Sequence, residues 1–182
     1  MIQLKNFAIN KYGLNVRLVN EYDAEFIIEL RTNPLLSKHL HHTSQDVELQ
    51  VEWIKEYKKR EEKGEEFYFA FSDSNSEKVI GFARIHDINY IEKTFHAGSW
   101  IFEKNINQIS PLLSEIIIKE LGFDLLELEY CYFDVRKENK HVIKYHLRYE
   151  PQLISEDIEN NYYCLSKDCY KKNINKILTY LI

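Results

Sequence analysis

Histidine side chains are the groups in this sequence best suited to move a proton near neutral pH, because an unperturbed imidazole has a pKa of about 6.5. The chain has 7 histidines. His96 lies in a segment with strand-like alternation, and His146 shares one face of an expected helix with Val142 and Ile143. Each has a structural alternative. A strand histidine can bond to a neighbouring loop, and a histidine on an apolar helix face is often part of the core.

A separate run of histidines, His39, His41 and His42, occupies a short polar stretch between two expected helices. Adjacent histidines in a loop rarely converge on one ion unless a carboxylate or a cysteine lies beside them. We therefore expect no metal site in this stretch.

The length and composition fit one globular domain that spans residues 1–182. The chain is 45% hydrophobic and 29% charged, and it has no apolar run of 18 residues, so we expect no membrane span. A net charge of −5 argues against a dedicated nucleic-acid-binding protein. Three cysteines without CxxC spacing, and an N-terminus without a signal-peptide pattern, favour reduced thiols and a cytoplasmic location.

The spacing of apolar residues predicts strands and helices in mixed order. The expected strands are Gln3–Ile9, Leu14–Leu18, Phe67–Phe71, Val79–Ile85, Phe95–Phe102, Leu126–Val135 and Tyr162–Leu165. The expected helices are one from about Asp23 to Arg31, one from Ser44 or Asp46 to about Glu62, Leu112–Leu121 with Gly122 ending it, Glu138–Tyr149, and a C-terminal segment that the pattern also allows, Ile174–Leu181. An early meander followed by β-α-β units predicts an α/β (α+β) fold with helices around a mixed sheet.

Three stretches of the sequence, taken in this order, resemble the GCN5-related N-acetyltransferase (GNAT) family. They are LNVRLVNEYDAEFIIELR (14–31), HAGSWIF (96–102) and VRKENKHVIKYHLRY (135–149). The resemblance runs from Leu14 to about Tyr163. It is closest to ribosomal-protein and amino-sugar acetyltransferases, because of the segment 98–101. It implies a mostly antiparallel, twisted sheet flanked by helices.

The resemblance also implies an activity, which is transfer of an acetyl group from acetyl-CoA to a primary amine by direct attack in a ternary complex, without a metal. The acceptor it suggests is a small molecule, an amino sugar or a nucleotide-linked amino sugar, and the protein is expected to be a monomer or a homodimer. Two alternatives stay open. One is acetylation of a protein N-terminus, and the other is a catalytically silent binding module of the same fold.

The two histidines acquire roles from the same resemblance. His96 lies two residues before Gly98, where relatives of the ribosomal-protein type often carry a glutamate, so it is the expected base. His146 lies seven residues after Asn139, where the family often has a tyrosine, so it is the expected acid. Tyr145 and Tyr149 flank His146 on the same segment and are alternatives to it.

The fourth family strand and the following helices imply the residues that hold the cofactor. Ile101 and Phe102 are expected to offer backbone groups to the pantetheine arm, and Trp100 to wall the acetyl pocket or to fill the core. Because we expect strict alternation, the side chains of His96, Gly98 and Trp100 should share one face. Asn139 is expected to contact the cofactor or to cap a helix.

The loop before the third helix departs from the family pattern, because residues 103–109 contain no glycine. Glycines let the backbone approach a pyrophosphate, and a helix N-terminus adds free N–H groups. Ser110 is the expected cap of this helix. Asn105 and Asn107 adopt left-handed conformations more readily than most residues. Asn107 and Ser110 are therefore the expected pyrophosphate contacts.

The acceptor site in the family lies along the loop between the first two helices. That loop contains His39, His41 and His42 here, so the resemblance places these side chains and Arg31 near the substrate. A nucleotide-linked acceptor would need basic or aromatic groups close to this loop, whereas a peptide acceptor would need an open groove with carboxylates. A polar surface loop is the structural alternative.

Overall fold

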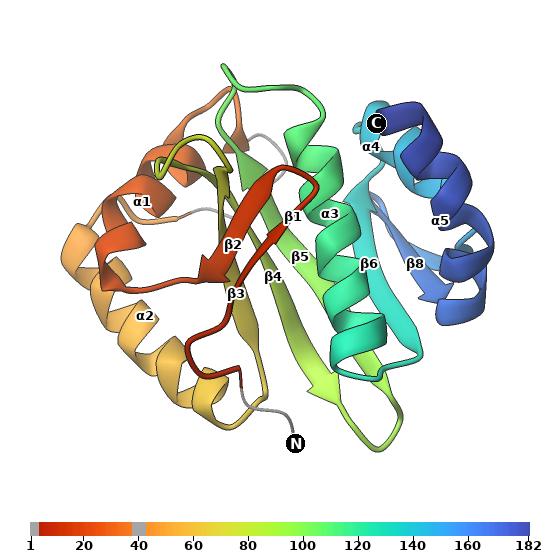
Figure 1. The fold of residues 1–182 in the computed structure, drawn as a ribbon, viewed down its shortest axis with the longest axis horizontal. Coiled ribbons are helices and arrows are strands. Elements are labelled where there is room, and N and C mark those ends of the chain that lie inside the picture. The colour runs from red at the N-terminus through yellow and green to blue at the C-terminus, as the bar shows by residue number, and fades with distance from the viewer. Residues whose placement is uncertain (1–3, 38–42) are drawn as a thin grey trace.

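The computed structural model describes residues 4–37 and 43–182. Its strands form one sheet in the order β1-β2-β3-β4-β5-β6-β8-β7, in which every neighbouring pair is antiparallel except β5 and β6 (Figure 1). The strands are β1 (Ala8–Lys11), β2 (Leu14–Leu18), β3 (Phe67–Asp73), β4 (Val79–Asn89), β5 (Thr94–Phe102), β6 (Tyr130–Arg136), β7 (Gln152–Glu156) and β8 (Asn160–Ser166). The helical segments are η1 (Glu21–Asp23), α1 (Ala24–Thr32), α2 (Val47–Glu62), α3 (Ser110–Glu120), η3 (Leu121–Leu125), α4 (Lys140–His146), η4 (Leu147–Tyr149) and α5 (Lys167–Leu181).

Each face of the sheet packs against a different set of helices, because successive side chains of a strand point to opposite faces. On β3, Phe67, Phe69 and Phe71 join the cluster that contains residues of α3 and α5, whereas Tyr68 and Ala70 join the cluster that contains residues of α1 and α2. Both faces of the central strands are therefore buried.

The only parallel pair in the described sheet is short. β5 pairs with β6 from Thr94 to His96, opposite Tyr130 to Tyr132, and the two strands have no ladder register beyond that point. On its other side β5 stays paired with β4 up to Phe102. The sheet therefore opens between β5 and β6, while the outer edge of each strand is held by an antiparallel neighbour.

A β-bulge lies in the half of β5 that pairs with β4 but not with β6. Gly98 is opposite Arg84 and Ile101 is opposite Phe82, so β5 has one residue more than β4 between these pairs. Ser99 has a φ of 50°, which is unusual for a residue other than glycine. The extra residue reverses the alternation, so Ile101 packs with the α1 and α2 cluster, whereas Trp100 packs with the α3 cluster. The expectation that Trp100 shares a face with Gly98 is wrong for this reason.

The order of elements predicted from the sequence is confirmed up to β6, and the main differences lie near the C-terminus. β7 was missing from the prediction, because all five of its residues are exposed and its apolar residues do not alternate. The C-terminal helix is longer than Ile174–Leu181, since the Ser166 side chain accepts a hydrogen bond from the Cys169 N–H and starts α5 at Lys167. β1 begins at Ala8 rather than at Gln3.

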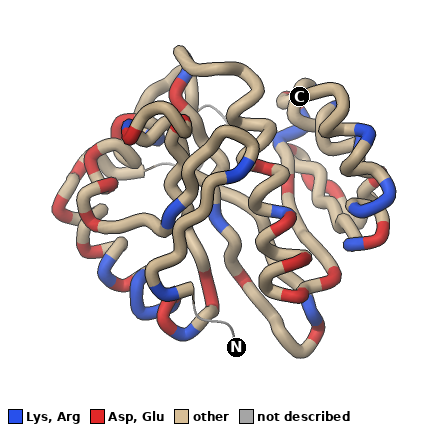
Figure 2. Tube along the Cα trace, viewed as in Figure 1, with Lys and Arg blue, Asp and Glu red and all other residues tan. Residues whose placement is uncertain are grey.

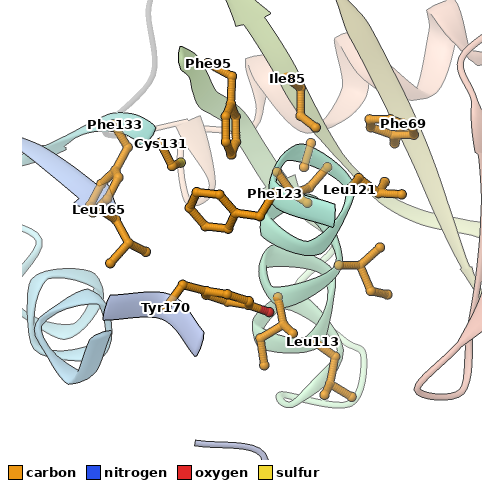
Figure 3. Close-up of a cluster of buried hydrophobic side chains, with 14 of the residues drawn as sticks. Phe69, Ile85, Phe95, Leu113, Leu121, Phe123, Cys131, Phe133, Leu165 and Tyr170 are labelled. Atoms are coloured by element: carbon orange, nitrogen blue, oxygen red, sulfur yellow. The ribbon is translucent and has the colours of Figure 1, made fainter. Parts of the chain in front are cut away.

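Gly122 was expected to end the third helix, and this expectation is wrong. The chain continues through Gly122 as a wider turn, η3, closed by a hydrogen bond from the Leu126 N–H to the Leu121 carbonyl. A β-carbon at Gly122 would lie 2.2 Å from Cζ of Phe95. Phe123 of the same turn packs between Phe95 and Tyr170, with ring centroids 5.3 and 5.2 Å away (Figure 3). Gly122 is therefore needed for close packing of the turn on β5.

We predict that Gly122→Ala destabilises the protein by about 1 to 3 kcal/mol, although alanine favours helix, because the added methyl group overlaps the Phe95 ring. Urea unfolding would measure the change in the free energy of unfolding. In the double variant with Phe95→Leu, the cost of the alanine should be smaller than in the single variant. Equal costs in the two backgrounds would contradict this explanation.

Candidate active site

A cavity of about 260 Å³ fills the gap where β5 and β6 separate. Its walls include Gly98, Ser99 and Trp100 of β5, and Phe133 to Arg136 of β6. Glu115 and Ile118 of α3 and His146 of α4 line it from one face of the sheet, while Arg31 and Leu36 line it from the α1 side. The cavity therefore extends through the sheet and is bordered by helices of both faces.

The bulge fixes two groups at the wall of this cavity. Trp100 is held against α3, since its Nε1–H lies 3.1 Å from the Pro111 carbonyl and 3.2 Å from Ser114 Oγ. Gly98 is close to β4, because a β-carbon there would lie 3.0 Å from Nε2 of His86. A side chain at position 98 would therefore push the His86 ring out of place.

His146 lies at the cavity wall and is 7% exposed. Its ring packs on Phe133, with centroids 4.5 Å apart, and faces the edge of Trp100 at 6.4 Å. Nδ1 is fully buried and lies 3.5 Å from Oε1 of Glu115, so the ring borders the cavity through its other atoms.

Glu115 connects α3 to α4 and η4. Its Oε2 accepts a hydrogen bond of 2.8 Å from the Tyr145 hydroxyl, and the Tyr149 hydroxyl lies 3.4 Å away. Its other oxygen, Oε1, pairs with Nζ of Lys119 one turn further along α3. Lys119 is completely buried, and its ammonium group lies over the rings of Phe133 and Tyr149. A buried carboxylate with an ammonium partner thus fixes the helices on this side of the cavity.

Burial and charge together set the protonation of His146. Loss of hydration lowers the pKa of His146 well below its usual 6.5, and the nearby Lys119 ammonium lowers it further. Burial also lowers the pKa of Lys119 to about 8. His146 is therefore a neutral imidazole at neutral pH, able to accept a proton at one nitrogen and to donate a hydrogen bond from the other.

The two tyrosines that flank His146 point away from the cavity. Their hydroxyl groups are 2.9 Å apart, and Tyr145 also donates toward the Leu112 carbonyl at 3.2 Å. Burial raises the pKa of both far above its ordinary value of 10. Neither is among the residues at the cavity wall, so of the three candidates only His146 lines the cavity.

His96 does not line this cavity, and it is the last residue of β5 that pairs with β6. Its ring lies between His86 of β4 and Tyr132 of β6, with centroids 5.6 and 5.4 Å away. His86, directly opposite His96 in the β4–β5 ladder, bonds to Asp87 through Nδ1, and burial lowers its pKa below 6.5. The structure thus places His96 next to Ala97, which lines the cavity, in a stack of aromatic rings.

Asn139 is the N-cap of α4, which is one of the two roles expected for it. Its side chain accepts a hydrogen bond from the Val142 N–H at the start of α4, and it also lines the cavity. Arg136 lines the cavity as well, and its guanidinium pairs with Glu159 of the loop before β8. Ile101 and Phe102 do not line the cavity. Their backbone pairs with β4 on one side and has no strand partner on the other side, toward β6.

The loop before α3 forms a compact turn rather than a nest for phosphate. The Asn107 side chain accepts from the Ile109 N–H, and its carbonyl accepts from the Ser110 N–H. Pro111 has no N–H, so few donors are free at this helix tip. Asn105 and Asn107 both have negative φ, and Ser110 is a buried first helical residue instead of the expected cap. The tip of α3 therefore offers few free N–H donors among the described residues.

Arg31 is at the wall of the cavity, as the expected acceptor contact would be, and its Nε–H donates to Thr43 Oγ1 at 2.6 Å. His39, His41 and His42 lie outside the described residues. Within residues 4–37 and 43–182, no group of three histidine, cysteine or acidic side chains is arranged to hold a metal. In the same part of the chain, no helix is long and apolar enough to cross a membrane.

Sequence reasoning missed three residues of the site. Glu115 and Lys119 are oppositely charged residues four positions apart that flank the apolar run Ile116–Ile118, which is a visible sign of a buried pair. His86 acquires its position beside Gly98 only from the β4–β5 register, which the sequence does not reveal.

Residues 14–149 match the family described as acetyltransferase (GNAT) domain. The chain therefore belongs to the GNAT acetyltransferase family, and the fold and family expected from the sequence are confirmed. No curated protein matches the sequence.

Several solved structures share the fold. Apo FdhC, a nucleotide-linked sugar GNAT, is 38% identical, with 97% of this chain and 99% of that chain covered and a TM-score of 0.86. The ribosomal-protein-S5-alanine acetyltransferase from Vibrio fischeri is 14% identical, with coverage of 89% and 97% and a TM-score of 0.73. The spermidine N-acetyltransferase from Vibrio cholerae, in complex with CoA and spermine, is 18% identical, with coverage of 88% and 99% and a TM-score of 0.70.

The buried His146 predicts how stability depends on pH. Its pKa is lower in the folded chain than in the unfolded chain, so below about pH 6.5 the unfolded chain binds an extra proton and the free energy of unfolding falls, by at most about 1.4 kcal/mol per pH unit for this group. His146→Phe should therefore lose less stability than the wild type between pH 7.5 and pH 5.5, as measured by urea unfolding at both pH values. Lys119, whose pKa burial lowers to about 8, is present in both proteins, so its contribution to the pH dependence cancels in this comparison.

The matched control is His141→Phe, since His141 is exposed on the same helix. This control should follow the wild type at both pH values. Parallel losses in the wild type and in His146→Phe would show that burial of His146 does not set the acid limb of stability.

Proposed function

We propose that the chain transfers an acetyl group from acetyl-CoA to the primary amine of an amino sugar, either free or linked to a nucleotide, by direct attack in a ternary complex. The observation that carries the proposal is the cavity through the sheet between β5 and β6. A thioester arm lying along the unpaired edge of β5 would bring its carbonyl to the bulge at Ser99. An amine would reach the same point from the side of α1.

The choice of acceptor is supported by similarity. The 38% identical structure covering almost the whole of both chains is of a nucleotide-linked sugar GNAT. The ribosomal-protein and spermidine enzymes are below 20% identity and support the shared fold alone.

We assign His146 the proton transfers near the departing sulfur. A neutral imidazole is a poor acid by itself, so His146 must first accept a proton, directly or through water, from the attacking amine and then pass it to the thiolate. The negative charge of Glu115, whose Oε1 lies 3.5 Å from Nδ1, favours the tautomer with the proton on Nδ1, which leaves Nε2 free to accept. His96 takes a different proton, the one that the ammonium form of the acceptor must lose before it can attack, from its position two residues before Gly98.

A catalytically silent binding module is the alternative that the glycine-free loop favours, because the tip of α3 offers few donors for a pyrophosphate. The two functions are distinguished by ligand binding and turnover. If the site takes acetyl-CoA, millimolar acetyl-CoA should raise the melting temperature.

The central experiment is a thiol-release assay with acetyl-CoA and three groups of acceptors: amino sugars, nucleotide-linked amino sugars and peptides with a free N-terminus. We expect release of CoA with an amino-sugar acceptor and none with peptides. Release with peptides alone would support the ribosomal-protein type of activity. Stabilisation by acetyl-CoA without release from any acceptor would support the binding module. If acetyl-CoA neither stabilises the protein nor releases CoA, both functions are contradicted.

The two histidines should differ in their kinetic effects. His146→Phe should lower kcat by about 10²-fold or more with little change in KM for acetyl-CoA, because it removes the proton transfers but keeps an aromatic ring on Phe133. His96→Ala should lower kcat/KM over the pH range in which the wild-type kcat/KM rises with pH. An unchanged kcat would remove His146 from the mechanism. A profile of unchanged shape and height would make His96 structural.

A further inference from the structure

A second cavity, of about 280 Å³, adjoins the first on the side of α1 and α2. Arg31 and Ser99 line both cavities, so the bulge of β5 lies on the border between them. The other polar groups at its wall come from Thr43, Gln50, Tyr68 and Arg84. Among the described residues at this wall there is no carboxylate.

The charge around this cavity is positive. Arg60 and Arg84 share the buried carboxylate of Glu66, at 2.8 and 2.9 Å. Arg31 has no carboxylate within ion-pair distance among residues 4–37 and 43–182, although its Nε–H is bonded to Thr43. At the wall itself, the described residues place two guanidinium groups, those of Arg31 and Arg84, and no carboxylate.

The guanidinium groups are held in place before any ligand binds. Arg84 lies over the ring of Trp53, 5.9 Å from the centroid, and that ring is stacked on Tyr57 at 5.7 Å. Tyr68 lines the cavity together with Arg31 and Arg84 and is buried, and burial raises its pKa to about 12 although the two guanidinium charges oppose this shift. The Tyr68 hydroxyl is thus a neutral donor beside two fixed cations.

This surface differs from α2, which contains both basic and acidic residues (Figure 2). Lys55 and Lys59 pair there with Glu52 and Glu56 on the same helix. Those charges neutralise one another in solvent and mark no ligand, as expected of i,i+3 pairs. The second cavity instead combines unbalanced guanidinium groups with partial burial.

Resting on the proposed function, we propose that the second cavity binds the diphosphate of a nucleotide-linked amino sugar, with Arg31 and Arg84 as the residues that determine specificity. A diphosphate diester carries two negative charges, which match the two positive charges here, and a guanidinium presents the paired donors that phosphate oxygens take. The sugar would then lie at Ser99 with its amine directed into the first cavity. A polyamine or another cationic acceptor would be repelled.

The test compares three acceptors that share one amino sugar: the free sugar, its 1-phosphate and its nucleoside diphosphate ester. In the wild type, kcat/KM should rise at least tenfold from the free sugar to the diphosphate ester. Arg31→Gln should reduce this ratio by about tenfold, which corresponds to about 1.4 kcal/mol, and Arg31→Lys should restore part of it. Arg148→Gln, which removes the same charge from an exposed position, is the matched control and should keep the wild-type ratio.

A second measurement does not depend on a folded variant. Uridine diphosphate should inhibit the wild type competitively against the diphosphate-linked acceptor and not against acetyl-CoA, and spermidine should not be acetylated. Equal kcat/KM for the three acceptors, or equal loss of the ratio in Arg31→Gln and Arg148→Gln, would overturn the inference while acetyl transfer to amino sugars stood. No release of CoA with any acceptor would contradict the proposed function itself, and the inference with it.

Discussion

The separation of β5 from β6 is the constraint on which the rest of this structure depends. Unpaired backbone groups are costly when they are buried, so a sheet can open in its middle only if something else compensates for the lost ladder. Here the outer edges of both strands stay paired, the bulge at Ser99 turns Trp100 onto α3, and helices of both faces border the gap. The cavity is therefore a consequence of strand register, and the residues around it serve to keep it open.

Much of this arrangement could be predicted from the sequence, because burial leaves clear periodic signals. The alternating segments gave the strands of the sheet up to β6, and the three stretches that resemble GNAT proteins gave the family. β7 could not be found, since its side chains are all exposed and carry no pattern. The sheet face on which Trp100 lies also could not be predicted, because a bulge adds one residue to a strand without requiring a particular residue type.

The candidate site was predicted in part, according to whether local sequence or tertiary contact determines each position. His146, Asn139, Trp100 and Arg31 line the cavity as residues near it were expected to do, whereas Asn107 and Ser110 are used within their own turn. The buried Glu115–Lys119 pair was overlooked although two opposite charges that flank an apolar run could have revealed it. Such a pair contributes little net stability by itself, because desolvation offsets the attraction; here its visible effect is to fix Tyr145 and Tyr149 and to keep His146 neutral.

The opening of the first cavity toward both faces of the sheet has a consequence for the order of events. In a pocket with a single mouth, the ligand that enters first is trapped behind the second, and products must leave in the reverse sequence. A cavity bordered by α3 and α4 on one side and by α1 on the other does not impose a fixed order of binding and release. If the chain works as proposed, donor and acceptor can each bind to the free protein, and steady-state kinetics should show random rather than compulsory addition.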